Sequence, residues 1–185
     1  DWMVDEAEKR NIEVVLVVGR KVPRWPECHA PIWANNDTPA DRKERILNYI
    51  KKTVDHYDKR KNLRMWQVDN EPYLPFGECP DKFSEDFLKK EIEIVLSKDP
   101  NHKIMITDSG ELSVWVKAAG LGDIFGTTMY RVIWHKTLGY FKYPLKSSFF
   151  WFKANIVHLF YPGKPIINCE LQGEPWGPKL IPHLS

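Results

Sequence analysis

Five short apolar runs recur along this chain, and each is separated from the next by a segment with helical periodicity. The runs cover residues 12–18, 63–68, 103–107, 124–130 and 165–170. They are too short for typical helices and rich in apolar, often β-branched residues, which is typical of strands buried on both faces of a parallel sheet. Strands that alternate with helices favour a parallel α/β sheet over a β-sandwich or a helical bundle.

The segments between the runs carry helix signals. Thr38, Pro39 and Asp41 supply a side-chain cap, a proline at the first helical position and an acid in the first turn. Apolar residues then recur at spacings of three and four and form one stripe: Ile46, Leu47, Ile50, Val54 and Tyr57. The sequence predicts three further helices, within 81–97, around 112–119 and over 148–161.

Two of the predicted strands deliver a glutamate at their carboxyl ends. Residues 66–72 read Trp-Gln-Val-Asp-Asn-Glu-Pro, and residues 165–170 read Pro-Ile-Ile-Asn-Cys-Glu. Glu71 and Glu170 are 99 positions apart (170 − 71), which leaves room for three strand-plus-helix units of about 30 residues each. Glycoside hydrolysis ordinarily uses two carboxyl groups, one to protonate the leaving oxygen and one to attack or stabilise the anomeric carbon. The pattern therefore predicts that these two glutamates meet and cleave a sugar linkage.

In order and spacing, most of the chain resembles the clan of retaining glycoside hydrolases built on (β/α)8 TIM barrels, which includes the family 5 cellulase-like enzymes and the family 42 β-galactosidases. In that clan an Asn-Glu pair at the end of the fourth strand carries the general acid/base, which falls on Asn70 and Glu71. The nucleophile ends the seventh strand and falls on Glu170. A tyrosine near the end of the sixth strand often bonds the nucleophile and corresponds to Tyr130.

The resemblance implies a retaining O-glycoside hydrolase that works by double displacement. Asn70 would bond the sugar hydroxyl next to the anomeric carbon, and Tyr130 would orient Glu170. Glu71 must begin protonated, and we expect burial and the charge of Glu170 to raise its pKa. The substrate would be an oligo- or polysaccharide.

The resemblance also implies an incomplete barrel. Residues 1–185 would form a single, partial glycoside hydrolase catalytic domain with strands three to seven, so that strands one, two and eight are missing. The arginine that the clan commonly places on the second strand and the aromatic residue on the eighth have no counterpart here. We expect this piece alone to be inactive. A complete open sheet of five strands is the alternative that 185 residues could build.

Aromatic residues follow several strands, where a barrel keeps its binding surface. Their rings could pack on the apolar C–H faces of a sugar. Candidates for further substrate contacts are Trp25, Trp33, Trp134, Trp176 and His29. Packing of the loops onto the barrel is an equally good reading for each tryptophan, and a solvated or loop-bracing role is favoured for His29. Four other tryptophans are assigned to the core or to helix packing, namely Trp2, Trp66, Trp115 and Trp151. For the polar loop residues Arg24, Glu27, Asp108 and Glu111, loop bracing is favoured over substrate binding.

Composition excludes some classes of partner. The net charge is +2, from 27 basic and 25 acidic side chains, which argues against a nucleic-acid surface. The most apolar window, 149–161, is too short to span a bilayer and contains Lys153 and His158. We therefore expect neither nucleic-acid binding nor membrane insertion. Oligomeric state and compartment, secreted or cytoplasmic, stay open.

The cysteines indicate neither a zinc ribbon nor a disulfide framework. Cys28, Cys79 and Cys169 are an odd set without paired C-x-x-C spacing. By strand alternation, Cys169 should face away from Glu170. No metal or other cofactor is expected.

Two alternatives from other classes stay open. The first is a barrel that binds glycans without cleaving them, although such a protein has no need of both glutamates. The second is a metal-dependent barrel enzyme that uses oxygen and imidazole ligands from Asp69, Glu71, Asp108 and His29. No His-x-Asp or His-x-His pair at a strand end supports it.

Overall fold

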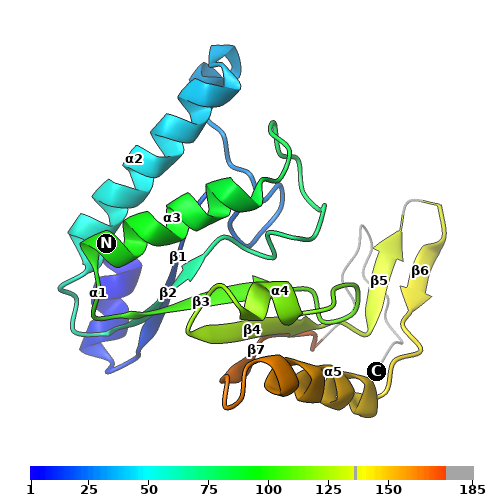
Figure 1. Cartoon of the computed structure of the whole chain (residues 1–185). Helices are drawn as coiled ribbons and strands as arrows, with labels where there is room; N and C mark the ends of the chain where they lie inside the picture. The colour runs from blue at the N-terminus through cyan, green and yellow to red at the C-terminus, as the bar shows by residue number, and fades with distance from the viewer. Residues whose placement is uncertain (136, 174–185) are drawn as a thin grey trace.

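Five parallel strands form one curled sheet in the computed structural model, which describes residues 1–135 and 137–173 (Figure 1). The strand order is β1-β2-β3-β4-β7, and every neighbouring pair is parallel. The strands are β1 (Val14–Val18), β2 (Leu63–Val68), β3 (Lys103–Asp108), β4 (Ile124–Met129) and β7 (Ile166–Leu171). All five correspond to the predicted runs, and the sheet is a partial (β/α)8 barrel.

The helices follow the expected alternation. They are α1 (Trp2–Lys9), α2 (Pro39–Tyr57), α3 (Glu85–Lys98), α4 (Val116–Ala119) and α5 (Ser147–Phe160), with a 3₁₀ helix, η1, over Ile32–Asn36. The predicted cap of α2 is present, because the Thr38 side chain accepts a hydrogen bond from the backbone N–H of Asp41 at 3.2 Å. Helix α4 is shorter than predicted, because Trp115 precedes it with a φ of 73°, outside the helical region.

An antiparallel hairpin of β5 (Val132–His135) and β6 (Gly139–Lys142) was not predicted. Each strand has only four residues, so the alternation of apolar and polar side chains is too short to be recognised. The hairpin follows β4 directly and forms a separate two-stranded sheet. It therefore begins at the carboxyl edge of the main sheet.

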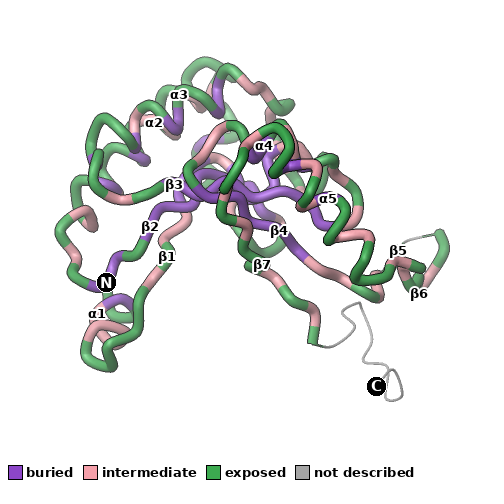
Figure 2. Tube along the Cα trace, turned by 60° about the horizontal axis from the view of Figure 1, so that its bottom comes forward, coloured by how far each residue is buried: buried purple, intermediate pink, exposed green. Residues whose placement is uncertain are grey.

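Side-chain alternation divides the strand residues between two faces. Trp66, Ile104 and Phe125 belong to the main core, which also includes apolar residues of the helices. Met65, Met105 and Ile124 are their neighbours in the sequence and form a smaller cluster, as expected for the opposite, concave face. Figure 2 shows helices α2 to α5 over the sheet, with burial greatest in the central strands and least in β7.

Two of the four tryptophans assigned to packing are misassigned. Trp66 and Trp115 are buried, but Trp2 is 74% exposed and Trp151 is 68% exposed. Both lie on helices, α1 and α5, where sequence alone does not show which side docks on the sheet. No helix within the described part of the chain is long and apolar enough to cross a membrane.

Candidate active site

Glu71 lies buried in the loop that follows β2, and its backbone takes an uncommon path. Asp69 has a φ of 56° and Glu71 a φ of 42°, in the left-handed region that residues other than glycine seldom adopt. Hydrogen bonds hold this path: the Glu71 N–H donates to Thr107 Oγ1 at 2.9 Å, and the Asn70 N–H donates to the carbonyl of Lys21 at 2.8 Å. Strand β3 and the loop after β1 thus hold the backbone from which the Glu71 side chain projects.

The end of β4 links the two glutamates. Thr128 Oγ1 donates to Glu71 Oε1 at 3.1 Å, and Tyr130 Oη donates to Glu170 Oε2 at 2.6 Å. Residues two apart on a strand point to the same face, roughly 7 Å from each other. Thr128 also lies opposite Glu170 in the pairing of β4 with β7. Both carboxyl groups therefore lie on one face at one edge of the sheet, and the Tyr130–Glu170 hydrogen bond expected from the resemblance is present.

An extra residue in β7 sets the direction of Glu170. Thr127 pairs with Asn168, whereas the next residue, Thr128, pairs with Glu170, so Cys169 is inserted. The Cys169 sulfur contacts the carbonyl of Thr127 at 3.2 Å and lies beside Gly126. The expectation that Cys169 faces away from Glu170 is wrong, because a β-bulge interrupts the alternation on which it rested.

The electrostatics distinguish the two carboxyl groups. Burial raises the pKa of Glu71 to about 7, and the negative charge of Glu170 is the second cause. The hydrogen bond from Thr128 acts in the opposite direction. Burial and the bond to Glu170 also raise the pKa of Tyr130, so its hydroxyl stays a donor. Near neutral pH a large fraction of Glu71 is protonated, as a general acid requires.

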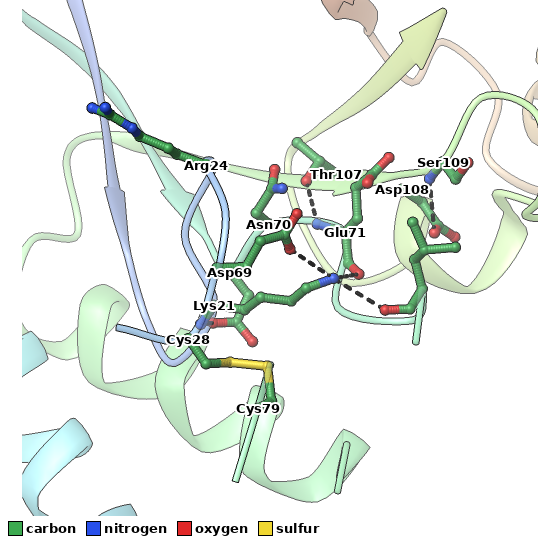
Figure 3. A network of polar contacts seen from close by, with 12 residues as sticks. Lys21, Arg24, Cys28, Asp69, Asn70, Glu71, Cys79, Thr107, Asp108 and Ser109 are labelled. Carbon is green, nitrogen blue, oxygen red and sulfur yellow. Dashed lines mark hydrogen bonds and ion pairs between the residues drawn. A yellow bond between two sulfur atoms is a disulfide. The ribbon is translucent and has the colours of Figure 1, made fainter. Parts of the chain in front are cut away.

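Lys21 is a residue of this site that the sequence did not reveal. It is 1% exposed, and its Nζ donates to the carbonyls of Glu71 and Leu74, each at 3.0 Å. Its own backbone N–H donates to Asp69 Oδ1 at 2.9 Å. Figure 3 shows the lysine reaching along the Asp69–Glu71 segment to these carbonyls. The one available signal was its position in the loop directly after a buried strand.

Gly19 makes the close approach of these loops possible. It has a φ of 128°, and a Cβ at this position would lie 2.3 Å from Asp69 Oδ1. Any side chain at position 19 would displace Asp69, and with it the carboxylate that accepts from Lys21.

Cys28 and Cys79 form a disulfide, with Cα atoms 5.0 Å apart, and this corrects the sequence interpretation. The bond joins the loop after β1 to the loop after β2, directly beneath the site (Figure 3). Nothing in the spacing of these cysteines indicates the pairing. It results from the meeting of two loops whose strands are neighbours in the sheet.

We expect loss of this disulfide to destabilise the protein by about 2 to 4 kcal/mol, because the bond closes a loop of 51 residues in the unfolded chain. Replacing both Cys28 and Cys79 by serine should therefore lower the urea midpoint markedly. Cys169→Ser is the matched control and should leave the midpoint nearly unchanged. Equal midpoints for the double variant and the unaltered protein would show that the disulfide contributes no stability.

The other predicted binding residues are distributed more widely. Trp25 stacks edge-on against Phe76 at 5.6 Å, on the loops after β1 and β2. Trp134 lies on β5, at the start of the hairpin. His29 and Trp33 line a cavity of about 310 Å³ whose lining includes neither glutamate. Their contact with substrate stays a prediction, and Trp176 lies outside the described residues.

The weaker polar candidates mainly brace loops. Asp108 accepts from the Ser109 N–H and the Ser113 hydroxyl, at 3.0 and 2.5 Å. Glu111 accepts from the Tyr130 N–H at 2.5 Å and so helps to place that tyrosine.

The metal alternative lacks a suitable arrangement of ligands. Within residues 1–135 and 137–173, no group of three or more His, Cys, Asp or Glu side chains is arranged to hold a metal ion. His29 Nε2 instead contacts the carbonyl of Arg24 at 3.2 Å, and Asp69 accepts from the backbone of Lys21.

Comparison with known proteins identifies the fold. No protein-family model matches the sequence, and no curated protein matches it. A cold-adapted β-galactosidase from Rahnella sp. R3 has a TM-score of 0.66 at 13% identity, covering 97% of this chain and 38% of its own. The GH53 catalytic domain of Ignisphaera aggregans has a TM-score of 0.62 at 20% identity, covering 91% and 49%. A GH2 β-galacturonidase from Eisenbergiella tayi, bound to galacturonate, has a TM-score of 0.62 at 13% identity, covering 97% and 28%.

The chain therefore has the fold of the (β/α)8 glycoside hydrolases, and it spans less than half the length of each of these three structures. The likeness selects neither family 5 nor family 42.

Proposed function

We propose that this chain carries the catalytic carboxyl groups of a retaining O-glycoside hydrolase, with Glu71 as general acid/base and Glu170 as nucleophile. The observation that carries the proposal is the pair of hydrogen bonds from alternate residues at the end of β4 and just beyond it, Thr128 to Glu71 and Tyr130 to Glu170. Glycoside hydrolysis by this mechanism needs two carboxyl groups on one face, and the one with the raised pKa can act as the general acid.

In the first step, Glu170 attacks the anomeric carbon while Glu71 donates its proton to the departing oxygen. The C–O bond to the leaving group breaks, and an ester to Glu170 forms. Tyr130 holds one oxygen of Glu170 in place, which leaves the other free to attack.

In the second step, Glu71 acts as the base. The ester carries no negative charge, so the repulsion that helped to raise the pKa of Glu71 is removed. Glu71 then takes a proton from water, and the resulting hydroxide oxygen attacks the anomeric carbon and releases Glu170. One residue serves both steps because the charge of its neighbour changes between them.

We also propose that residues 1–185 belong to one catalytic barrel domain that further strands complete. Among the described residues, β1 and β7 are each paired on one side only, and sheet edges of this kind are normally paired or covered. We expect the 185-residue chain alone to be inactive. Activity experiments therefore concern an active form of the protein, in which this chain is joined to the strands that close its barrel; we refer to it as the active protein.

The test is hydrolysis of a panel of aryl glycosides by the active protein, with the product anomer followed by proton NMR. Double displacement inverts the anomeric carbon twice, so the first-formed sugar should retain the configuration of the substrate. A first product of opposite configuration would exclude Glu170 as nucleophile. Binding of oligosaccharides without hydrolysis of any substrate would instead support a non-catalytic glycan-binding barrel.

A further inference from the structure

The loop that follows β1 places another carboxyl group, that of Glu27, beside the proposed catalytic segment. Glu27 is 5% exposed. Asn70 and Glu170 both act on its carboxyl group: the Asn70 side chain lowers the pKa of Glu27, and the negative charge of Glu170 raises it. A buried carboxylate in this position is not needed for the two-step reaction, so its presence calls for another role.

Glu27 and Gln67 together fix the orientation of the Asn70 amide. Gln67 Nε2 donates to Asn70 Oδ1 at 3.2 Å, which leaves the Asn70 NH₂ group as the part of the amide that can stabilise the Glu27 carboxylate and lower its pKa. If the Asn70 amide were turned over, its oxygen would face the Glu27 carboxylate and its NH₂ group would face the NH₂ group of Gln67. Both contacts would be repulsive. Since the amide nitrogen has two hydrogens, one can point to Glu27 while the other remains for a ligand.

Lys21 connects Glu27 to the backbone of Glu71. Its Nζ lies 3.1 Å from Glu27 Oε2, in the geometry of an ion pair rather than of an aligned hydrogen bond. The same nitrogen donates to the carbonyls of Glu71 and Leu74. A buried ammonium group needs a compensating charge, and Glu27 supplies it, so the two side chains form one unit.

The loop that carries Glu27 is itself held in place. Cys28, the next residue, is bonded to Cys79. The Glu27 carbonyl accepts from the Val22 N–H at 3.0 Å, and the Pro26 carbonyl accepts from the Glu78 N–H at 2.9 Å. Glu27 therefore lies on a braced loop. Figure 3 labels Lys21 and Cys28 of the same loop and shows the disulfide to Cys79.

We infer that Glu27 is a positioning residue for the reaction: through the Asn70 amide and the Lys21 ammonium group, it fixes the geometry in which Asn70 and Glu71 meet the sugar. This inference rests on the proposed function. It differs from a purely structural role because it requires Glu27 to act on catalysis through Asn70.

The test is a double-mutant cycle in the active protein, with kcat and KM measured for Glu27→Ala, Asn70→Ala and the double variant. Glu27→Ala should lower kcat/KM by about 10- to 100-fold, mostly through kcat, because a misplacement of about 1 Å costs rate at this scale. In the Asn70→Ala background, the same change should cost clearly less than it costs alone, since one of the two groups through which Glu27 acts is gone. Losses that simply multiply would overturn the inference.

Conservative and control variants separate positioning from folding. Glu27→Gln keeps an oxygen that can accept from Asn70 but removes the charge that compensates Lys21, so it should recover only part of the activity that Glu27→Ala loses. Glu78→Gln makes the same change on an exposed side chain next to the disulfide and should leave kcat and KM unaltered. If Glu27→Ala does not fold, Glu27→Met replaces it in the cycle, because it fills a similar volume without an acceptor.

The outcomes distinguish the inference from the function on which it rests. A folded Glu27→Ala variant with unaltered kcat/KM, in a protein that Glu71→Gln inactivates, would overturn the inference and leave the proposed function standing. An active protein in which Glu71→Gln and Glu170→Ala have no effect would overturn both.

Discussion

Glu170→Ala should abolish turnover in the active protein, lowering kcat/KM by about 10⁴-fold or more, because it removes the carboxylate that we propose forms the covalent intermediate. Glu170 is half-buried at the end of an edge strand of the sheet, so its truncation should leave the fold intact. A circular-dichroism melt that matches that of the unaltered protein would confirm this.

Chemical rescue makes the Glu170 prediction specific to a nucleophile. The alanine variant leaves a small space next to the anomeric carbon, which azide can enter. Azide attack with departure of an activated aryl group should give a glycosyl azide of inverted configuration, since only one displacement takes place. Cys169→Ser, at the neighbouring residue, is the control and should hydrolyse its substrate at close to the normal rate. Unchanged hydrolysis by Glu170→Ala would remove this residue from the mechanism.

Glu71→Gln should lower kcat/KM by about 10²- to 10⁴-fold for sugars with poor leaving groups, which need a proton as they depart. The loss in kcat/KM should be much smaller for a dinitrophenyl glycoside, whose leaving group departs without protonation. A loss of equal size for both kinds of substrate would show that Glu71 is not the acid.

The pH profile gives an independent measure of the same group. The active form of Glu71 in the first step is the protonated one, and its pKa is raised to about 7 by burial and by the charge of Glu170. The kcat/KM of the unaltered protein should therefore fall as the pH rises above about 7, and Glu71→Gln should lack this limb. Thr128→Val removes a hydrogen bond that lowers the pKa of Glu71, so it should move the limb to higher pH. A limb that stays in place in both variants would belong to another group.

Much of the proposed mechanism depends on one short strand end. Thr128 and Tyr130 bond the two glutamates from alternate positions of β4 and its extension, and Gln172 joins the end of β7 to Val132 at the start of the hairpin, with its Nε2 donating to the Val132 carbonyl at 2.6 Å. Side-chain hydrogen bonds from one strand end therefore fix both carboxyl groups, as the proposed mechanism requires.

The strands, the helices and the two glutamates were predictable from sequence because each depends on a local pattern. A buried parallel strand needs a continuous apolar run, the start of α2 needs the cap formed by Thr38 and Asp41, and a barrel brings strand ends to one edge whatever the loops contain. The order of strands and helices along the chain is therefore enough to predict that Glu71 and Glu170 lie at the same edge of the sheet. The boundaries of α4 and the four-residue hairpin strands were not predictable, because each depends on too few residues.

The residues that support the glutamates were decided only by the tertiary structure. Lys21, Glu27 and the disulfide between Cys28 and Cys79 act between two loops that lie about 50 residues apart in the chain, and loop paths leave no periodic signal in a sequence. The bulge at Cys169 likewise depends on how β7 pairs with β4. The sequence thus determined which strand ends carry the carboxyl groups, through the periodicity of burial. The tertiary structure determined which neighbouring residues hold these carboxyl groups in place and shift their pKa values. Such contacts form only when separate strands place their loops side by side.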